Sequence, residues 1–516
     1  YHRYTTDFYF NLLILAHQNN INLEKELSPV LSQMAEYLCR TMRPDGTVLL
    51  IGDDDGGKLL SLSCRDPYDF RDSLALASAL FGKPEWKYVA GADVPELLWL
   101  IGPDGHSRYS QLKAQRPLDY FRAFEESGQY FGRTGWGETS SWLFFRCGPP
   151  AALSGAHEHA DQLSFEFFAD GVPWLVDPGT YTYTLDETAR NEFRLSGAHN
   201  TLIVDSQPQS SPKGPFSWNE RAGGKAGRVF ANPQLTYIEG VHDGYQSLDP
   251  PVDHHRSLLL VRRDEDSSFE MPDYLIAHDR LKTDGDHGYS LAYHFGPEVD
   301  AEADSTGFRA RHSLGNSLLI RHRSTMDFRA SVCASFLSER YGHRRESRLG
   351  LLHASGRGEH EISTIILPVS ADAPFQPCVS IPCESTGSIR VRSQKTQDWI
   401  QFGSGVLNVG EWSVSASSSI LWIRRSSSGL LRVAMVGANA LAIDGLFELR
   451  LAAADGIVLC ELHGDQLSLS FGPTTEVDLS VAGNLRRVIS ASDCMEVTAG
   501  SGLRHVKGVW TVFRRD

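Results

Sequence analysis

Three histidines and one aspartate between residues 157 and 199 are the side chains best suited to chemistry. His157 and His159 alternate, so on an extended segment both imidazoles project from the same face. Asp177 lies beyond a predicted hairpin that can return the chain to its neighbour, and His199 follows further along. His159, Asp177 and His199 together offer two nitrogens and one oxygen, which suits tetrahedral zinc with one open or water-filled position. The alternative for any one of these histidines is a hydrogen-bonded residue of the core.

Other kinds of metal site fit the sequence poorly. The cupin site also begins with His-x-His, but it needs a glutamate three or four residues later, where this chain has Leu163 or Ser164. The eight cysteines are scattered without a Cys-x-x-Cys pair, which excludes a thiolate zinc site and a disulfide scaffold. Cys378 and Cys383 are close enough to bridge a short loop, although two separate buried thiols are the favoured interpretation.

Composition limits the classes of partner. The 516 residues predict about three domains, and 41% hydrophobic with 22% charged residues is typical of a folded protein. A net charge of −15 argues against nucleic acid, and no apolar run is long enough for a membrane span. An anionic ligand would need a locally basic cleft, and Arg190 and Arg194 supply positive charge close to the histidines.

Elements with helical periodicity precede elements with strand periodicity. Apolar spacing predicts helices over 27–38 and 68–80, the second ending before a glycine. Beyond about residue 122 the alternation predicts strands at 142–146, 163–168 and 172–176. The fold class is therefore α+β and multidomain. The expected domains are a helical domain at 1–122, a central antiparallel β-sandwich domain with the His/Asp site at 123–400, and a C-terminal β-sheet domain at 401–516.

The sequence resembles the heparinase II/III-like family of polysaccharide lyases over roughly residues 1 to 300. The matching motifs are Tyr1-His2-Arg3-Tyr4, His157-Glu158-His159-Ala160-Asp161, Asp177-Pro178-Gly179-Thr180-Tyr181-Thr182-Tyr183, Phe193-Arg194 and Ala198-His199-Asn200-Thr201. Family members pair an incomplete α/α toroid with antiparallel β-sheet domains, and the substrate binds between them. The resemblance thus implies a partial toroid for 1–122, which we expect to be truncated at its N-terminus.

The resemblance assigns roles residue by residue. It implies that His157 is the catalytic histidine and that His159, Asp177 and His199 hold one structural zinc. Tyr1 matches the family's catalytic tyrosine, while Tyr181 and Tyr183 both match a further active-site tyrosine, with no choice between them. The family's asparagine on an earlier toroid helix has no matching position. With Tyr1 as the first residue, we expect weak catalysis by this chain and an exposed apolar patch on its first helix, at Phe8, Phe10, Leu12 and Leu13.

Further polar residues are candidate substrate contacts. We expect the substrate to meet His2, Arg190, Arg194, His255 and Arg256, although the last two also suit a surface strand. Residues that pack within a sheet or form ion pairs are the favoured interpretation of His278, Asp279, Arg280 and His294. The acidic run 52–57 lacks the spaced ligands of a calcium loop, so a solvated turn between helices is favoured over a substrate-facing loop.

These assignments predict a polysaccharide lyase. It would cleave a uronate-containing glycan by β-elimination, leave a 4,5-unsaturated uronate end, and use zinc structurally. The alternatives are a non-catalytic glycan-binding or scaffold protein with the same fold, and a metal-dependent hydrolase. The expected partner is an anionic polysaccharide, without nucleic acid or membrane, and the expected location is periplasmic or secreted. Heparan sulfate, alginate, hyaluronan and bacterial exopolysaccharide all remain open as substrates.

Overall fold

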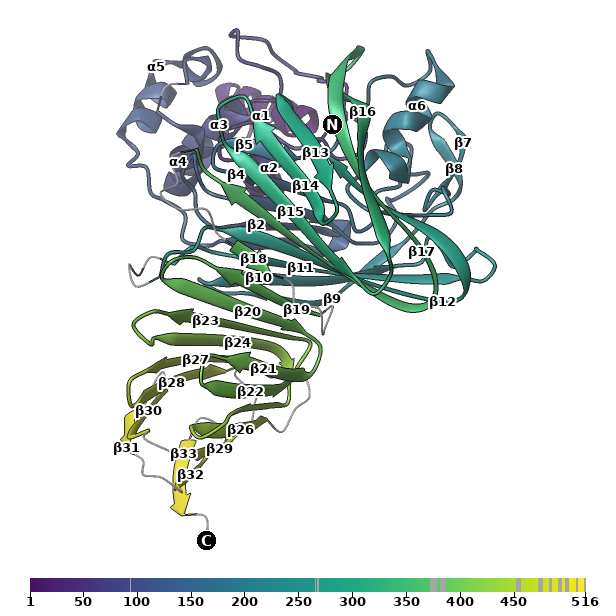
Figure 1. The fold of residues 1–516 in the computed structure, drawn as a ribbon. Coiled ribbons are helices and arrows are strands. Elements are labelled where there is room, and N and C mark those ends of the chain that lie inside the picture. The colour runs from purple at the N-terminus through teal and green to yellow at the C-terminus, as the bar shows by residue number, and fades with distance from the viewer. Residues whose placement is uncertain are drawn as a thin grey trace.

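The chain folds as a helical layer followed by a stack of β-sheets (Figure 1). A computed structural model describes residues 1–516 except 93, 265, 267–268, 372–377, 381–386, 452–455, 472–476, 482–484, 491–493, 497–500, 507–508 and 515–516. Cys383 lies outside the described residues, so the possible bridge between Cys378 and Cys383 stays a prediction. Among the described residues, no helix combines the length and apolar character of a membrane-spanning segment. The α+β class expected from the sequence is confirmed.

The helical layer has its own apolar core. Its helices are α1 (His2–Gln18), α2 (Glu24–Thr41), α3 (Arg71–Phe81), α4 (Pro84–Ala90) and α5 (Glu96–Gln111). The predicted stop after α3 is confirmed, because Gly82 ends that helix at φ 65°, in the left-handed region that favours glycine. The predicted apolar patch on α1 is half right. Phe10 and Leu13 are buried in the helical core, and Phe8 and Leu12 are exposed.

The first sheet lies between the helices and the rest of the β region. It is a meander of β1 (Phe121–Phe124), β2 (Gln129–Arg133), β3 (Trp142–Arg146), β4 (Phe165–Ala169) and β5 (Val172–Leu175). Alternate side chains of β3 point to opposite faces, as strand geometry requires. Trp142 and Phe144 pack with Leu49 from the α2–α3 loop, whereas Leu143 and Phe145 face the second sheet.

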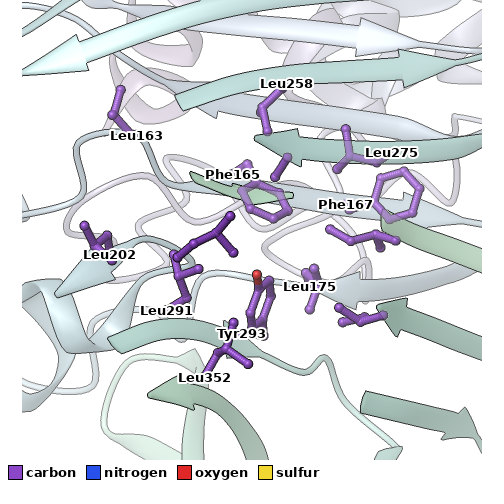
Figure 2. Packing of buried hydrophobic residues seen from close by; sticks show 14 of the residues in the cluster. Leu163, Phe165, Phe167, Leu175, Leu202, Leu258, Leu275, Leu291, Tyr293 and Leu352 are labelled. Carbon is purple, nitrogen blue, oxygen red and sulfur yellow. The ribbon is translucent and has the colours of Figure 1, made fainter. Parts of the chain in front are cut away.

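The second sheet has ten strands and encloses the largest core with the first (Figure 2). Its strands are β6 (Leu202–Val204), β9 (Gly224–Ala231), β10 (Leu235–His242), β11 (Val252–Val261), β12 (Tyr274–His294), β13 (Val299–Asp304), β14 (Gly307–His312), β15 (Ser317–Ser324), β16 (Phe328–Arg340) and β17 (His343–Val369). Phe165 and Phe167 of β4 meet Leu258 and Leu275 across this core. Between β6 and β9 lies a separate hairpin of β7 (Ser211–Gly214) and β8 (Ser217–Glu220).

Two further sheets follow. The third contains β18 (Cys378–Ser380), β19 (Ser388–Arg392), β20 (Thr396–Phe402), β23 (Ile420–Ser426), β24 (Leu431–Ala438), β27 (Gly456–His463), β28 (Gln466–Phe471), β30 (Arg487–Ser490) and β31 (Cys494–Glu496). The fourth contains β21 (Gly405–Val409), β22 (Trp412–Ser417), β25 (Ala440–Ile443), β26 (Phe447–Leu451), β29 (Val477–Val481), β32 (Ser501–Val506) and β33 (Val509–Arg514). The pairing of β28 with β30 is parallel.

The second and third sheets share a core, so the expected boundary at residue 400 does not separate them. β20 crosses that residue and pairs with β23, and β18 and β19 join the same sheet from before it. Leu259 and Val261 point from β11 towards Trp422 of β23, while their neighbour Leu258 points to the first sheet. Each middle sheet is therefore covered on both faces.

Candidate functional site

Four segments from distant parts of the chain, three of them loops and one helical, meet where the helical layer faces the first two sheets. They are the α2–α3 loop, the β3–β4 loop, the segment after β5, and α6 (Glu187–Arg194) with the short 3-10 helix η2 (Ser196–Ala198) behind it. The Asp53 N–H donates to the His157 carbonyl at 3.0 Å, and the Asp54 N–H donates to Thr180 Oγ1 at 2.8 Å. Gly52 has φ 59°, and a Cβ there would overlap the His157 carbonyl oxygen, so this close approach requires glycine.

Asp53 is the centre of the site. Its carboxylate is fully buried and accepts from His157 Nδ1 at 3.0 Å and from His159 Nε2 at 2.9 Å. Arg190 of α6 forks onto the same carboxylate, with Nη2 2.7 Å from Oδ2 and Nη1 bonded to Oδ1. Burial alone would raise the pKa of Asp53, but His159 and Arg190 outweigh it and lower the pKa to about 2. Asp53 is therefore an anion that joins the helical layer to the β3–β4 loop and to α6.

The two histidines of His-x-His differ in exposure, although the segment is a loop rather than the extended strand expected. The His157 side chain is 45% exposed, and that of His159 is fully buried. Both reach the same carboxylate, and Glu158 between them turns to Arg146 and Arg221. His157 donates through Nδ1, which leaves Nε2 as the nitrogen able to accept a proton from a ligand.

The three predicted metal ligands lie together. One ligand atom from each of His159, Asp177 and His199 can be chosen so that all lie within 4.8 Å of one another. Asp177 Oδ2 accepts from His199 Nδ1 at 2.7 Å, and the two imidazole centroids are 5.3 Å apart. Burial would lower the pKa of His199, but Asp177 outweighs burial and raises it. A metal ion bound here would replace that proton.

The donors present fit a zinc ion. His159 Nδ1 and His199 Nε2 are buried ring nitrogens without a hydrogen-bond partner in the described structure, an arrangement that costs stability unless something binds them. His159 turns its other nitrogen to Asp53, and this contact between a histidine and a carboxylate is typical of metal-ligating histidines. Two imidazoles and one carboxylate are ligands that zinc accepts in tetrahedral sites.

Two tyrosines complete the exposed side of the site. The Tyr1 and Tyr183 hydroxyls are 3.0 Å apart, and the Tyr1 hydroxyl also donates to Asp55 Oδ2 at 3.0 Å. The Tyr1 ring centroid lies 4.4 Å from that of His157, and the Tyr183 centroid lies 6.1 Å from it. An exposed imidazole beside two phenols brings together groups able to accept and to donate a proton.

The structure separates Tyr181 from Tyr183. Tyr181 has φ 61°, and its ring turns away to pack 5.5 Å from Phe193. Tyr181 therefore lies outside the cluster formed by Tyr1, Tyr183 and His157. Burial raises the pKa of both cluster phenols, and Asp53 and Asp55 raise it further, so Tyr1 and Tyr183 stay protonated.

Three of the five expected substrate contacts are structural or lie elsewhere. Arg194 is buried and donates to the carbonyls of Gly214 and Pro215 in the β7–β8 hairpin. Arg256 is buried, pairs with Asp279, and donates to the Leu163 and Asn200 carbonyls. His255, its neighbour on β11, is exposed on the opposite face of that strand.

The other two expected contacts have different places. Arg190 lies in the site, but it is buried and forked on Asp53. His2 turns away from Tyr1, donates through Nε2 to the Met34 carbonyl, and lines a separate cavity of about 1100 Å³ with Tyr37 and Trp86. Neither side chain is presented to a ligand beside His157.

The sequence interpretation missed Asp53. The favoured solvated turn for 52–57 is wrong at this residue, which is 3% exposed, and holds for Asp55, which is exposed. One signal was available, because the acidic run follows directly on Leu49 and Leu50, which are buried. Only the fold decides which of three consecutive aspartates turns inward.

Solved structures of similar fold carry titles that name a heparan sulfate lyase or heparinase III. The heparan sulfate lyase HepC from Pedobacter heparinus aligns at 17% identity over 77% of this chain and 56% of its own, with a TM-score of 0.57. A heparinase III structure aligns at 16% identity over 76% and 57%, with a TM-score of 0.58. The heparinase III BT4657 gene product aligns at 15% identity over 84% and 57%, with a TM-score of 0.57. The chain thus spans a little more than half the length of each, and this likeness establishes the fold.

The family comparison covers the β part of the site. No curated protein sequence matches the chain. A family model described as heparinase II/III-like, C-terminal, matches residues 116–390, which is more than half of the chain. The matched range contains the His-x-His pair, the segment after β5 and α6, whereas Tyr1 and Asp53 precede it. The chain belongs to the heparinase II/III-like family.

Proposed function

We propose that the protein is a polysaccharide lyase that cleaves a uronate-containing glycan by β-elimination. The proposal rests above all on one observation. The exposed His157 imidazole lies in contact with the protonated Tyr1–Tyr183 pair, and Asp53 fixes the imidazole from the buried side. The titles of the similar solved structures, which name a heparan sulfate lyase and heparinase III, support the same reaction class.

Each residue has a chemical task in this proposal. The proton on the ring carbon next to the uronate carboxylate passes to His157 Nε2, and the bond to the glycosidic oxygen breaks as the new double bond forms. Tyr1 or Tyr183 returns a proton to that oxygen. The raised pKa of both phenols favours them as the acid and His157 as the base. Asp53 accepts from Nδ1 and stabilises the imidazolium that forms, as carboxylates do behind other catalytic histidines.

Zinc is proposed as one structural ion per chain, held by His159, Asp177 and His199. It would compensate the buried charge of Asp177 and fix the segment after β5, which carries Tyr183. Substituting the two histidines of His-x-His separates this role from proton transfer. His157→Ala is expected to abolish turnover with metal content and melting temperature almost unchanged, and His159→Ala is expected to lower both. Equal metal loss in the two variants, measured by elemental analysis, contradicts the assignment.

The activity test is a panel of uronate polymers followed by ultraviolet absorbance of the new carbon–carbon double bond. Heparan sulfate, alginate, hyaluronan and a bacterial uronate exopolysaccharide represent the open substrates. An absorbance rise that disappears in His157→Ala supports the lyase. Saturated products that disappear with chelator indicate a hydrolase instead, and tight binding without any product indicates a glycan-binding protein. A periplasmic or secreted location is proposed with the lyase, because such polymers lie outside the cytoplasmic membrane.

A further inference from the structure

A hairpin tip carrying several arginines lies against the tyrosine segment of the site. β16 and β17 rise together beside the N-terminus and α6, and their connection is residues 341–342 (Figure 1). The Ser338 N–H donates to the Pro178 carbonyl at 2.7 Å, and the Gly342 N–H donates to the Tyr181 carbonyl at 2.8 Å. The Tyr341 hydroxyl accepts from the Tyr183 N–H at 3.1 Å, and the two rings are 4.8 Å apart. These hydrogen bonds therefore hold the hairpin tip in a fixed position beside Tyr183.

The arginines of this tip differ in whether a carboxylate neutralises them. Arg340 pairs with Asp66 at 2.5 Å, and Arg345 pairs with Glu339 at 2.5 Å. Arg344 has no carboxylate within ion-pair distance among the described residues. Its guanidinium lies 4.5 Å from the Phe336 ring centroid and 5.0 Å from that of Tyr181, and the residue is exposed. One cation at the rim of the site is thus held by two aromatic rings and left without a counter-charge.

Such a group is suited to bind an oxyanion. Stacking on rings holds the guanidinium plane and leaves its N–H groups, which lie in that plane, available for bidentate hydrogen bonds. The side chain has already lost much of its conformational freedom, so binding costs less ordering than for a free surface arginine. A protein with a net charge of −15 also repels polyanions in general, which makes a local cation beside the site more valuable.

We propose that Arg344 binds an acidic group of the glycan, a carboxylate or a sulfate ester, on a sugar next to the one that reacts. The inference deepens the proposed lyase function and rests on it for the position of the reacting sugar. It assigns a task to Tyr181, which supports the guanidinium of this subsite instead of joining the proton-transfer cluster. Arg344 touches the flanking sugar and not the reacting atoms, so it contributes to binding and selectivity.

Binding is best measured without turnover. The full chain carrying His157→Ala is titrated calorimetrically with a sulfated heparan sulfate hexasaccharide and with an unsulfated hyaluronan hexasaccharide. Adding Arg344→Gln is expected to weaken binding about tenfold and to flatten the dependence of log Kd on log salt. Loss with both ligands identifies a carboxylate, and loss with the sulfated ligand alone identifies a sulfate ester. Arg344→Lys, which keeps the charge and loses the planar fork, is expected to fall between.

Arg345→Gln is the matched control, because it removes an equal charge from the same tip where Glu339 already neutralises it. Its expected effect on Kd is less than twofold. Equal effects of the two glutamine variants, an unchanged Kd in Arg344→Gln, or no binding of either hexasaccharide overturns the inference. A lowered melting temperature with unchanged Kd in Arg344→Gln means that the stacking is only structural. The lyase proposal is judged separately, since product formation by the chain with His157 intact is measured by absorbance.

Discussion

At the scale of single residues, the buried ion pair between Asp53 and Arg190 determines how the site responds to substitution. Both side chains are fully buried, and two imidazoles share the same carboxylate. A buried pair is costly to assemble, and removing one partner leaves the other as an unpaired charge. The site therefore depends on Asp53 for integrity as well as for orienting His157.

Replacing Asp53 with asparagine tests this dependence. Asp53→Asn is expected to lower the free energy of unfolding by about 3–5 kcal/mol, because Arg190 stays buried and charged without its partner. Asp55→Asn, two residues along and exposed, is expected to change it by less than about 0.5 kcal/mol. The two variants are compared with the unchanged protein by their denaturant unfolding midpoints, provided that the dependence of unfolding free energy on denaturant stays the same. Similar small losses in both variants would mean that Arg190 finds another partner.

The two tyrosines near the site provide a second test at this scale. Tyr183→Phe removes the hydroxyl that bonds Tyr1 and is expected to reduce turnover by about 10²–10⁴-fold. Tyr181→Phe keeps the ring that supports Arg344 and is expected to leave turnover within about twofold. Initial rates on the best polymer of the panel, at saturating substrate, measure both. Comparable losses would return Tyr181 to the proton-transfer cluster.

Individual residues also show where sequence reasoning stops. The pattern of His159, Asp177 and His199 was enough to select three residues that lie together. His159 and Asp177 flank the predicted strands 163–168 and 172–176, whereas His199 follows α6 and η2, which were not predicted. The choice between Tyr181 and Tyr183 depends on a left-handed backbone conformation at Tyr181, which no residue type signals for a tyrosine. Arg194 and Arg256 looked like cations available to a ligand, yet both guanidinium groups donate hydrogen bonds to backbone carbonyls of other segments.

At the scale of elements, the alternation of side chains along the sequence predicts a strand well where its two faces pack against different layers, as those of β3 do. β3 begins and ends as expected, but β4 starts at Phe165 rather than Leu163. Leu163 has φ 59° and lies in a turn closed by the Ser164 N–H on the Asp161 carbonyl. The long hairpin of β16 and β17 was not predicted, since its tip is polar and its pairing is decided by contacts with the tyrosine segment.

A buried histidine of β15 makes the second sheet sensitive to acid. His322 donates through Nδ1 to Thr364 Oγ1 or accepts from it at 2.8 Å, and its ring packs against Tyr293, Phe308 and Phe328. Burial, with a further contribution from Arg321, lowers its pKa from 6.5 to about 3, while Asp279 and Asp304 oppose the shift. The unfolded chain therefore binds a proton that the folded chain excludes.

Stability is accordingly expected to fall as pH drops from about 6.5 towards 3, with no contribution from His322 above that window. Each unit of pKa difference corresponds to about 1.4 kcal/mol. His322→Phe is expected to flatten this part of the stability profile, measured by denaturant unfolding at a series of pH values. Phe308→Leu, which loosens the same contacts without removing a titrating group, should lower the whole curve and keep its slope. An unchanged slope in His322→Phe contradicts the assignment.

At the scale of the whole molecule, successive sheets share their cores, so the β region behaves as one stack. Alternate residues of β11 serve two cores, with Leu258 on one side and Leu259 on the other. The chain length predicted about three domains. The expected boundary at 400 came from the pattern of predicted strands and turns along the sequence. That pattern does not show which strands pair with each other. The expected boundary therefore cuts through β20, which pairs with β23.

Trp422 tests how far this stack acts as a unit. It is 1% exposed between the second and third sheets, and Trp422→Ala is expected to cost about 3–5 kcal/mol. Amide exchange should then rise in β11 and β12 as well as in β23, because both sheets lose a covered face. Trp99→Ala, at a residue 75% exposed, is the control with little expected change. Faster exchange restricted to β23 and β24 would show two independent units.

The position of Asp53 in the chain has a consequence for how the protein folds. Its carboxylate is separated from its three partners, His157, His159 and Arg190, by 104, 106 and 137 residues. Closing contacts over such a separation is slow, because the entropy of the intervening chain must be lost first. The order of events during folding is then constrained. Until the helical layer docks, Arg190 lacks the carboxylate of Asp53, His157 lacks the acceptor of its Nδ1 proton, and Tyr1 lacks contact with His157 and Tyr183. We therefore expect a molecule whose helical layer has not yet docked to be inactive, because these contacts are absent from it.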